Sequence, residues 1–135
     1  MRYLLDTNAV SALMKGDPKV VNRLRSFSKG DVGISQPVIA EIAYGIERLP
    51  RSKRRAALEE RFDFLRAELP RASWTDEVSE RFGHIKAILE RKGIKIKDFD
   101  AAIAAHALAE QAVLVTANLD DMVRVPELLV EDWAR

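Results

Sequence analysis

Apolar residues along the chain fall into two patterns that alternate with each other. Short apolar runs predict buried strands, clearest at 3–5, 32–35 and 113–116, with weaker candidates at 72–74 and 128–130. Apolar residues spaced three or four apart predict helices at 8–15, 37–49, 52–69, 76–92 and 98–111, and a further one opening at Asp17-Pro18. Because the last helix is apolar nearly all round, we expect it to be packed in the core.

The alternation of short apolar strands with helices is typical of α/β proteins. We predict a single domain over residues 1–135, built on a mainly parallel sheet that helices cover on both faces. Parallel sheets bind ligands beyond the carboxyl ends of their strands. The polar residues that follow each strand are therefore the first candidates for a site.

Three acidic residues stand in apolar surroundings. Asp6 directly follows the first strand, Glu41 is the only charge between 37 and 46, and Asp100 precedes a stretch without another charge until Glu110. A buried carboxylate costs several kcal/mol unless a cation or hydrogen-bond donors compensate it. Three converging carboxylates would also raise one another's pKa values. A divalent cation such as Mg²⁺ or Mn²⁺, which prefers oxygen ligands, resolves both problems, so the pattern predicts a metal site.

Each polar candidate also has a structural alternative. Asp6 could cap the first helix, and Glu41 could lie on an exposed strip of its own helix. Asp98 and Asp100 could each cap the 98–111 helix or face its dipole, and Asp98 is the better placed as a cap. Asn118 could be an amide that caps a loop. Residue type and position leave these alternatives open.

Composition and charge exclude several classes of protein. The chain has no cysteine, which excludes disulfides, thiolate catalysis and cysteine-based zinc sites. Its 22 basic and 21 acidic residues give a net charge of +1, which argues against a protein that holds nucleic acid by bulk positive charge. We find no membrane span, no signal peptide and neither of the glycine-rich phosphate-binding motifs. We therefore expect a cytoplasmic protein without a membrane partner.

Four motifs, in this order, resemble those of the PIN-domain ribonucleases, and most closely the VapC toxins of toxin–antitoxin modules. They are DTN at 6–8, SQPVIAEIAYGI at 35–46, DFDAAIAAHAL at 98–108 and VLVTANLDD at 113–121. The resemblance extends from Tyr3 to Trp133. It implies an α/β/α sandwich with a Mg²⁺- or Mn²⁺-dependent endoribonuclease site at the carboxyl edge of the sheet. Hydrolysis of RNA there would leave a 5′-phosphate and a 3′-hydroxyl.

The resemblance also implies roles for individual residues. It assigns catalysis and metal binding to Asp6, Glu41 and Asp100. The supporting residues that it implies are Thr7, Asn8, Asp98, Thr116 and Asn118. Many relatives have a fourth acid at the place of Asn118, so the choice between one and two metal ions stays open. The reaction needs neither histidine: we expect His106 to be a hydrogen-bonded core residue and His84 to lie on a helix flank.

Basic residues lie beside the predicted site and suggest how RNA could be held. Lys92, Lys95 and Lys97 lead directly to Asp98, and we expect them to contact phosphates. A second basic cluster spans 48–55. For both clusters the alternative is a solvent-exposed helix end.

The resemblance implies partners as well as a substrate. It predicts a homodimer and a VapB-type antitoxin whose C-terminal segment covers the active site, often with an arginine among the acids. Together with the antitoxin, a higher complex on operator DNA is expected. Two alternatives remain: a PIN-fold binding module whose catalysis has lapsed, and an RNA-processing PIN nuclease without an antitoxin.

Overall fold

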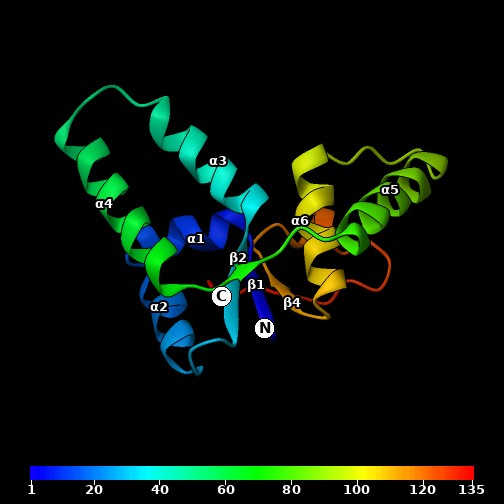
Figure 1. Ribbon diagram of the computed structural model, residues 1–135, viewed down its shortest axis with the longest axis horizontal. Coiled ribbons are helices and arrows are strands. Elements are labelled where there is room, and N and C mark those ends of the chain that lie inside the picture. The colour runs from blue at the N-terminus through cyan, green and yellow to red at the C-terminus, as the bar shows by residue number, and fades with distance from the viewer.

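A five-stranded sheet forms the centre of the structure, a computed structural model that describes residues 1–135 (Figure 1). Its strands lie in the order β3-β2-β1-β4-β5, and every pairing is parallel, as predicted. The bounds of the strands are β1 Tyr3–Leu5, β2 Val32–Ser35, β3 Arg71–Ala72, β4 Val113–Val115 and β5 Val130–Glu131.

Seven helices connect and cover the strands. Their bounds are α1 Thr7–Met14, α2 Pro18–Arg25, α3 Gln36–Glu47, α4 Lys53–Glu68, α5 Asp76–Arg91, α6 Asp98–Ala109 and α7 Leu119–Met122. In Figure 1, α3 and α4 lie to one side of the central strands and α5 and α6 to the other. The apolar spacing predicted six of the helices and missed α7, because a single turn is too short to show a helical period. None of the helices is long and apolar enough to cross a membrane.

The element bounds differ from the prediction where neighbours, rather than local sequence, decide them. The third strand was predicted at 72–74 and lies at Arg71–Ala72, because these two residues pair with Ile34 and Ser35 of β2. The last strand was predicted at 128–130 and lies at Val130–Glu131, in register with β4. Strands this short are defined by the register of the partner strand.

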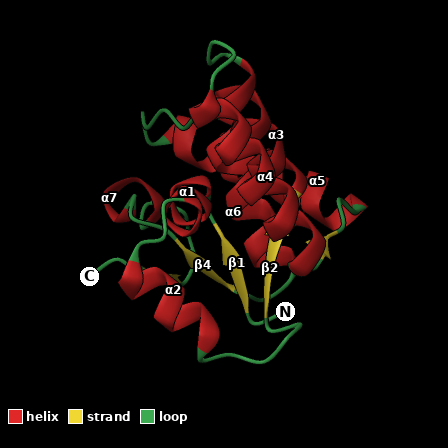
Figure 2. Ribbon diagram, turned by 90° about the vertical axis from the view of Figure 1, so that its left-hand side faces the viewer, coloured by secondary structure: helices red, strands yellow, loops and turns green.

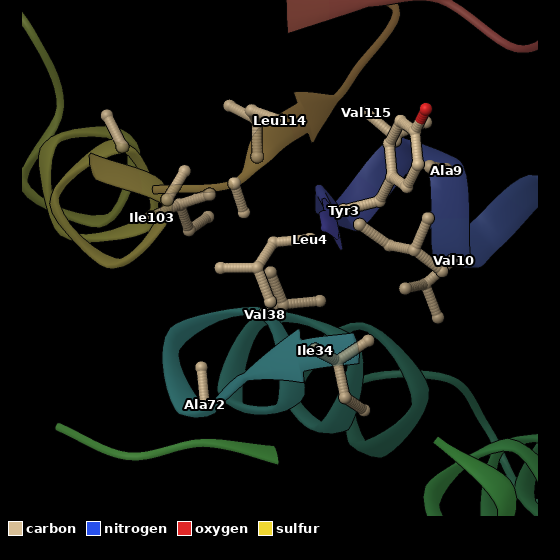
Figure 3. Close-up of a cluster of buried hydrophobic side chains, with 14 of the residues drawn as sticks. Tyr3, Leu4, Ala9, Val10, Ile34, Val38, Ala72, Ile103, Leu114 and Val115 are labelled. Carbon is tan, nitrogen blue, oxygen red and sulfur yellow. The ribbon is translucent and has the colours of Figure 1, made fainter. Parts of the chain in front are cut away.

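Side chains of the strands alternate between two helix layers. In Figure 3, Leu4 of β1 points toward Ile103 of α6, whereas Tyr3 lies on the side of Val10 of α1. Tyr3 and the other three side chains are buried in one continuous core. Both faces of the sheet are therefore covered, which confirms the α/β/α architecture and explains why the strands are apolar throughout.

The carboxyl ends of the strands meet at one edge of the sheet, where β1 leads into α1 and β2 into α3 (Figure 2). The register of β1 and β4 pairs Leu5 with Val115. The backbone NH of Asp6 then donates to the carbonyl of Val115 at 2.8 Å, so the sheet ladder continues one residue further. Asp6 and Thr116 thus become neighbours on adjacent strands, with side chains on the same face.

Candidate active site

Asp6 is the most buried acid of the protein, with 4% of its surface exposed. Its Oδ1 accepts a 2.7 Å hydrogen bond from the backbone NH of Thr7, which makes Asp6 the N-cap of α1. Its Oδ2 accepts a 2.8 Å hydrogen bond from the hydroxyl of Thr116. Burial raises the pKa of Asp6, the hydrogen bonds from Thr116 and Thr7 oppose this, and the charge of Glu41 raises it further. The capping alternative is therefore correct for Asp6, and the carboxylate still faces the site.

Thr116 organises the residues around Asp6 through one buried hydroxyl. It donates to Asp6 and accepts hydrogen bonds from Nδ2 of Asn8 at 3.2 Å and from the backbone NH of Asn118 at 2.9 Å. Asn8 also fixes the following turn, because its Oδ1 accepts a 2.8 Å bond from the backbone NH of Ala117. The hydroxyl thus uses its one donor and both of its acceptor positions. The side chain of Asn118 makes no capping bond, so the loop-cap alternative is wrong for this residue.

Thr7 connects the first carboxylate to the second. Its backbone NH binds Asp6, and its hydroxyl donates a 2.6 Å hydrogen bond to Oε1 of Glu41. Glu41 is half-buried in the middle of α3, the helix that follows directly from β2. Its side chain is therefore oriented toward the sheet edge rather than spread on an exposed strip of α3.

Asp100 supplies the third carboxylate from the first turn of α6. It is half-buried, and its side chain takes part in no hydrogen bond or ion pair within the protein. Burial raises the pKa of Asp100, and the negative charges of Asp6 and Glu41 raise it further, while Lys97 opposes them. The three predicted acids therefore act on one another electrostatically although they come from three different elements.

A pocket of about 800 Å³ joins these side chains. The predicted residues that line it are Asp6, Thr7, Asn8, Glu41, Asp100 and Asn118. Thr116 is 1% exposed and lies beneath, where it supports Asp6. The sequence-derived site is thus brought together almost completely, and nine of the twelve residues that line the pocket have polar side chains.

The donor set of this pocket fits a hydrated divalent cation. It offers carboxylate, amide and hydroxyl oxygens, with no histidine and no sulfur. No three acidic or histidine side chains are close enough together to hold one ion at the same time. Mg²⁺ needs no such cage, because it commonly binds through one or two carboxylates and keeps several waters. Burial is the main cause of the raised pKa values of Asp6 and Asp100, and the neighbouring carboxylate charges raise them further; a bound cation would favour the ionised form of both.

Asp98 and the predicted RNA-binding lysines lie outside the lining of this pocket. Asp98 is exposed and pairs with Lys86 of α5, and the N-cap of α6 is Lys97, so the expectation that Asp98 caps the helix is wrong. Lys95 and Lys97 are exposed and line a small pocket with Asp100, whereas Lys92 ends α5 outside it. Their contacts with RNA remain a prediction.

The two histidines occupy the expected places, with one difference. His84 is exposed on α5. His106 is completely buried in α6, but neither ring nitrogen has a hydrogen-bond partner, so the expectation of a hydrogen-bonded histidine is wrong. Its ring instead packs edge-on against Trp74 at 5.1 Å between centroids. Burial lowers the pKa of His106, which keeps the imidazole neutral.

Six pocket residues were not predicted from the sequence, and three of them are polar, namely Ser11, Lys15 and Asp17. A signal for two of them exists, because Thr7, Ser11 and Lys15 follow one another at four-residue spacing on α1. Residues so spaced share one face of a helix. A polar face on a helix that begins at a candidate acid therefore indicates the wall of a site.

Comparisons with known proteins show the family and the fold of the chain. The family described as PIN domain matches residues 3–128. The chain is 34% identical over 135 residues to Ribonuclease VapC2 of Rickettsia felis, with 98% of each chain covered. It is 29% identical to the tRNA(fMet)-specific endonuclease VapC of Salmonella typhimurium, again with 98% of each covered. The crystal structure of VapBC2 from Rickettsia felis bound to a promoter DNA fragment matches with a TM-score of 0.88 at 32% identity, covering 98% of this chain and 99% of that chain.

Proposed function

The chain belongs to the PIN-domain family, in its VapC branch, and we propose that it is a divalent-metal-dependent endoribonuclease that serves as the toxin of a type II toxin–antitoxin pair. The observation that carries the proposal is the convergence of Asp6, Glu41 and Asp100 on one polar pocket at the carboxyl edge of the sheet. Such a pocket offers ligands for a hard cation and no cysteine or histidine for nucleophilic catalysis. The relatives named ribonuclease and endonuclease support the same reaction.

Each residue of the pocket has its own role in the proposed reaction. A divalent cation bound through one or two of the carboxylates of Asp6, Glu41 and Asp100, with waters completing its shell, would supply an activated water and neutralise charge on the phosphate. Thr116 and the Thr7 backbone keep the Asp6 carboxylate oriented and favour its ionised form. The Thr7 hydroxyl orients Glu41 in the same way. These fixed donors reduce the reorganisation needed when substrate binds.

The rival hypothesis of a lapsed binding module is disfavoured by the same pocket. All three carboxylates are present, and Thr7 and Thr116 hold two of them in place. A buried acid costs stability, and the pKa of Asp6 stays raised despite the hydrogen bonds around it, so its presence favours a use for it. Asn118 lines the pocket and offers an amide oxygen, which is a weaker ligand than a carboxylate.

The antitoxin part of the proposal is supported by the neighbouring structures. A VapBC2 complex from Rickettsia felis and a VapBC complex from Salmonella typhimurium were both solved bound to DNA, at TM-scores of 0.88 and 0.85. We infer a VapB-type antitoxin for this chain, and with it a complex on operator DNA in the cytoplasm. The predicted homodimer belongs to the same proposal.

Expression in a bacterial host tests the toxin directly. We expect the wild-type protein to arrest growth, and Asp6→Ala and Asp100→Ala to abolish the arrest, because each removes one of the three carboxylates. Asp63→Ala is the matched control, since Asp63 is exposed on α4 and has no ion pair. Co-expression of the gene product encoded next to the toxin should restore growth.

The pattern of outcomes separates the alternatives. Arrest by all four proteins would contradict a carboxylate-dependent nuclease. Growth of cells that express wild type, together with cleavage of RNA by the purified protein, would favour an RNA-processing nuclease without an antitoxin. If wild-type protein neither arrests growth nor cleaves RNA, the result would favour the lapsed binding module.

A further inference from the structure

A second groove leads away from the acidic pocket between α1, α3 and α4. It has a volume of about 400 Å³ and is continuous with the acidic pocket, because the two share four lining residues, Lys15 and Glu41 among them. We call it the basic groove, after the three cations Lys15, Arg48 and Arg54 that line it. Figure 1 shows α1, α3 and α4, the three helices between which the basic groove lies.

The three cations of the basic groove have no acidic partner within the protein. None of them takes part in an ion pair. Glu41, at the end next to the acidic pocket, is the only acid that lines the groove. Arg55, the neighbour of Arg54, differs: it pairs with Glu47 at 3.0 Å and with Glu59 at 2.7 Å. Of two adjacent arginines, one therefore joins α3 to α4 and the other is free to bind an anion.

The floor of the basic groove is apolar and open. Its residues with large apolar side chains are Met14, Ile42, Ile46, Leu49 and Leu58. Gly45 adds width, because a Cβ placed there would meet no atom within 4 Å. Cations on the rim and hydrocarbon on the floor suit a nucleic-acid strand, whose phosphates contact the first and whose sugars and bases contact the second.

We propose that the basic groove binds the RNA backbone on one side of the cleaved bond, with Arg48 and Arg54 contacting phosphates. This inference rests on the proposed function, since RNA must occupy the acidic pocket for its strand to continue here. Arg48 follows Glu41 by seven residues, about 10 Å along α3, so it contacts a phosphate other than the scissile one. Lys15 stands at the junction of the two cavities, nearest to the scissile phosphate.

A binding experiment with two matched double variants tests the proposal. The probe is a single-stranded RNA dodecamer of mixed sequence with a 5′ fluorophore, and affinity is measured by anisotropy in EDTA. Arg48→Ala/Arg54→Ala should weaken RNA binding about tenfold or more. The slope of log affinity against log salt concentration should become shallower by about 1.4, or about 0.7 for each phosphate that is no longer neutralised. Arg51→Ala/Lys53→Ala removes the same charge from the same connection but does not line the groove, so it should change affinity less than twofold.

A second pair of variants, both at Gly45, tests the groove without removing a cation. Gly45→Ala adds an uncharged methyl group that meets no atom of the protein within 4 Å, so it should weaken RNA binding far less than Gly45→Glu. Gly45→Glu projects a longer, negatively charged side chain into the groove and should weaken RNA binding about tenfold, while circular dichroism confirms that the protein is folded. The same dodecamer is then used for cleavage by wild type and by each variant with Mg²⁺ present.

The two measurements separate failure of this inference from failure of the proposed function. Cleavage of RNA by wild type tests the nuclease activity. The ratio of the RNA affinities of the two double variants, measured by anisotropy, tests the groove whether or not cleavage occurs. An equal decrease of affinity in both double variants would show a general charge effect and overturn the proposal. Full affinity in Arg48→Ala/Arg54→Ala would also overturn it, and weaker binding of an acidic antitoxin peptide by that variant would then assign the groove to the protein partner.

Discussion

The replacement of Thr116 by valine removes one hydroxyl from the centre of the site and almost nothing else. Valine has the shape of threonine, so the buried position stays filled. Three hydrogen bonds disappear together: the one donated to Asp6 at 2.8 Å and the two accepted from Asn8 and from the Asn118 backbone. Thr116→Ser keeps the hydroxyl and is the matched control.

The expected loss of stability follows from these three bonds. A hydrogen bond to a charged group contributes about 1.5–3 kcal/mol, and a neutral one about 1 kcal/mol. Of the two neutral donors, Asn8 keeps its second hydrogen bond, to Oδ2 of Asp6 at 3.4 Å, which limits the loss. We therefore expect Thr116→Val to lower the free energy of unfolding by about 2–4 kcal/mol at neutral pH.

The loss of stability in Thr116→Val should also depend on pH. Burial raises the pKa of Asp6, and the Thr116 hydroxyl is the largest influence that opposes it. Valine should therefore raise the pKa of Asp6 further. The stability that the hydroxyl contributes through the ionised carboxylate is present at neutral pH and is lost as the pH falls through the folded-state pKa of Asp6.

Urea unfolding in EDTA, followed by circular dichroism from neutral to acidic pH, measures both quantities. The difference between wild type and Thr116→Val should shrink as Asp6 becomes protonated, while Thr116→Ser stays close to wild type. A loss of stability below about 0.5 kcal/mol, or one that does not change with pH, would refute the reasoning from the hydrogen-bond network.

Three further predictions concern stability, each measured by urea unfolding in EDTA. Asp100→Asn should stabilise the protein at neutral pH, because burial and the charges of Asp6 and Glu41 raise the pKa of Asp100. The gain in stability should vanish below the ordinary pKa of 3.8, where the wild-type carboxyl is protonated in both the folded and the unfolded chain. His106→Leu should remove the loss of stability that wild type shows as pH falls below 6.5, because burial lowers the pKa of His106 and protonation then favours the unfolded chain. Gly33→Ala should cost about 1–3 kcal/mol, because its Cβ would lie 2.8 Å from the carbonyl oxygen of Pro70, which pairs β3 with β2. Unchanged stability in any of these variants would contradict the contact on which it rests.

Two of the three acids, Asp6 and Asp100, could be predicted from the sequence because a strong constraint acts on each. Asp6 follows an apolar strand, and Asp100 introduces an apolar helix, so solvent cannot be their normal environment. In a parallel sheet both places lie at the same edge. Thr116 follows from the same rule, since it ends the strand that pairs with β1.

The residues that sequence reasoning misplaced depend on packing between distant elements. Asp98 and Asp100 are two residues apart on α6 and point in different directions. Asp98 pairs with Lys86 of α5, and only the packing of α5 against α6 decides this. The basic groove is likewise invisible in sequence, because Lys15 and Arg54 meet only where α1 and α4 pack beside α3.

Hydrolysis of RNA by a carboxylate-bound metal at this sheet edge is the central claim, and one titration tests it most directly. Purified wild-type protein is stripped with EDTA, and the cleavage rate of the fluorescent RNA dodecamer is followed as Mg²⁺ is added back. We predict no cleavage without metal, a saturable rise with Mg²⁺ that is absent in Asp100→Asn, and products with 5′-phosphate ends. Cleavage that persists in EDTA, or products that end in a 2′,3′-cyclic phosphate, would contradict the claim.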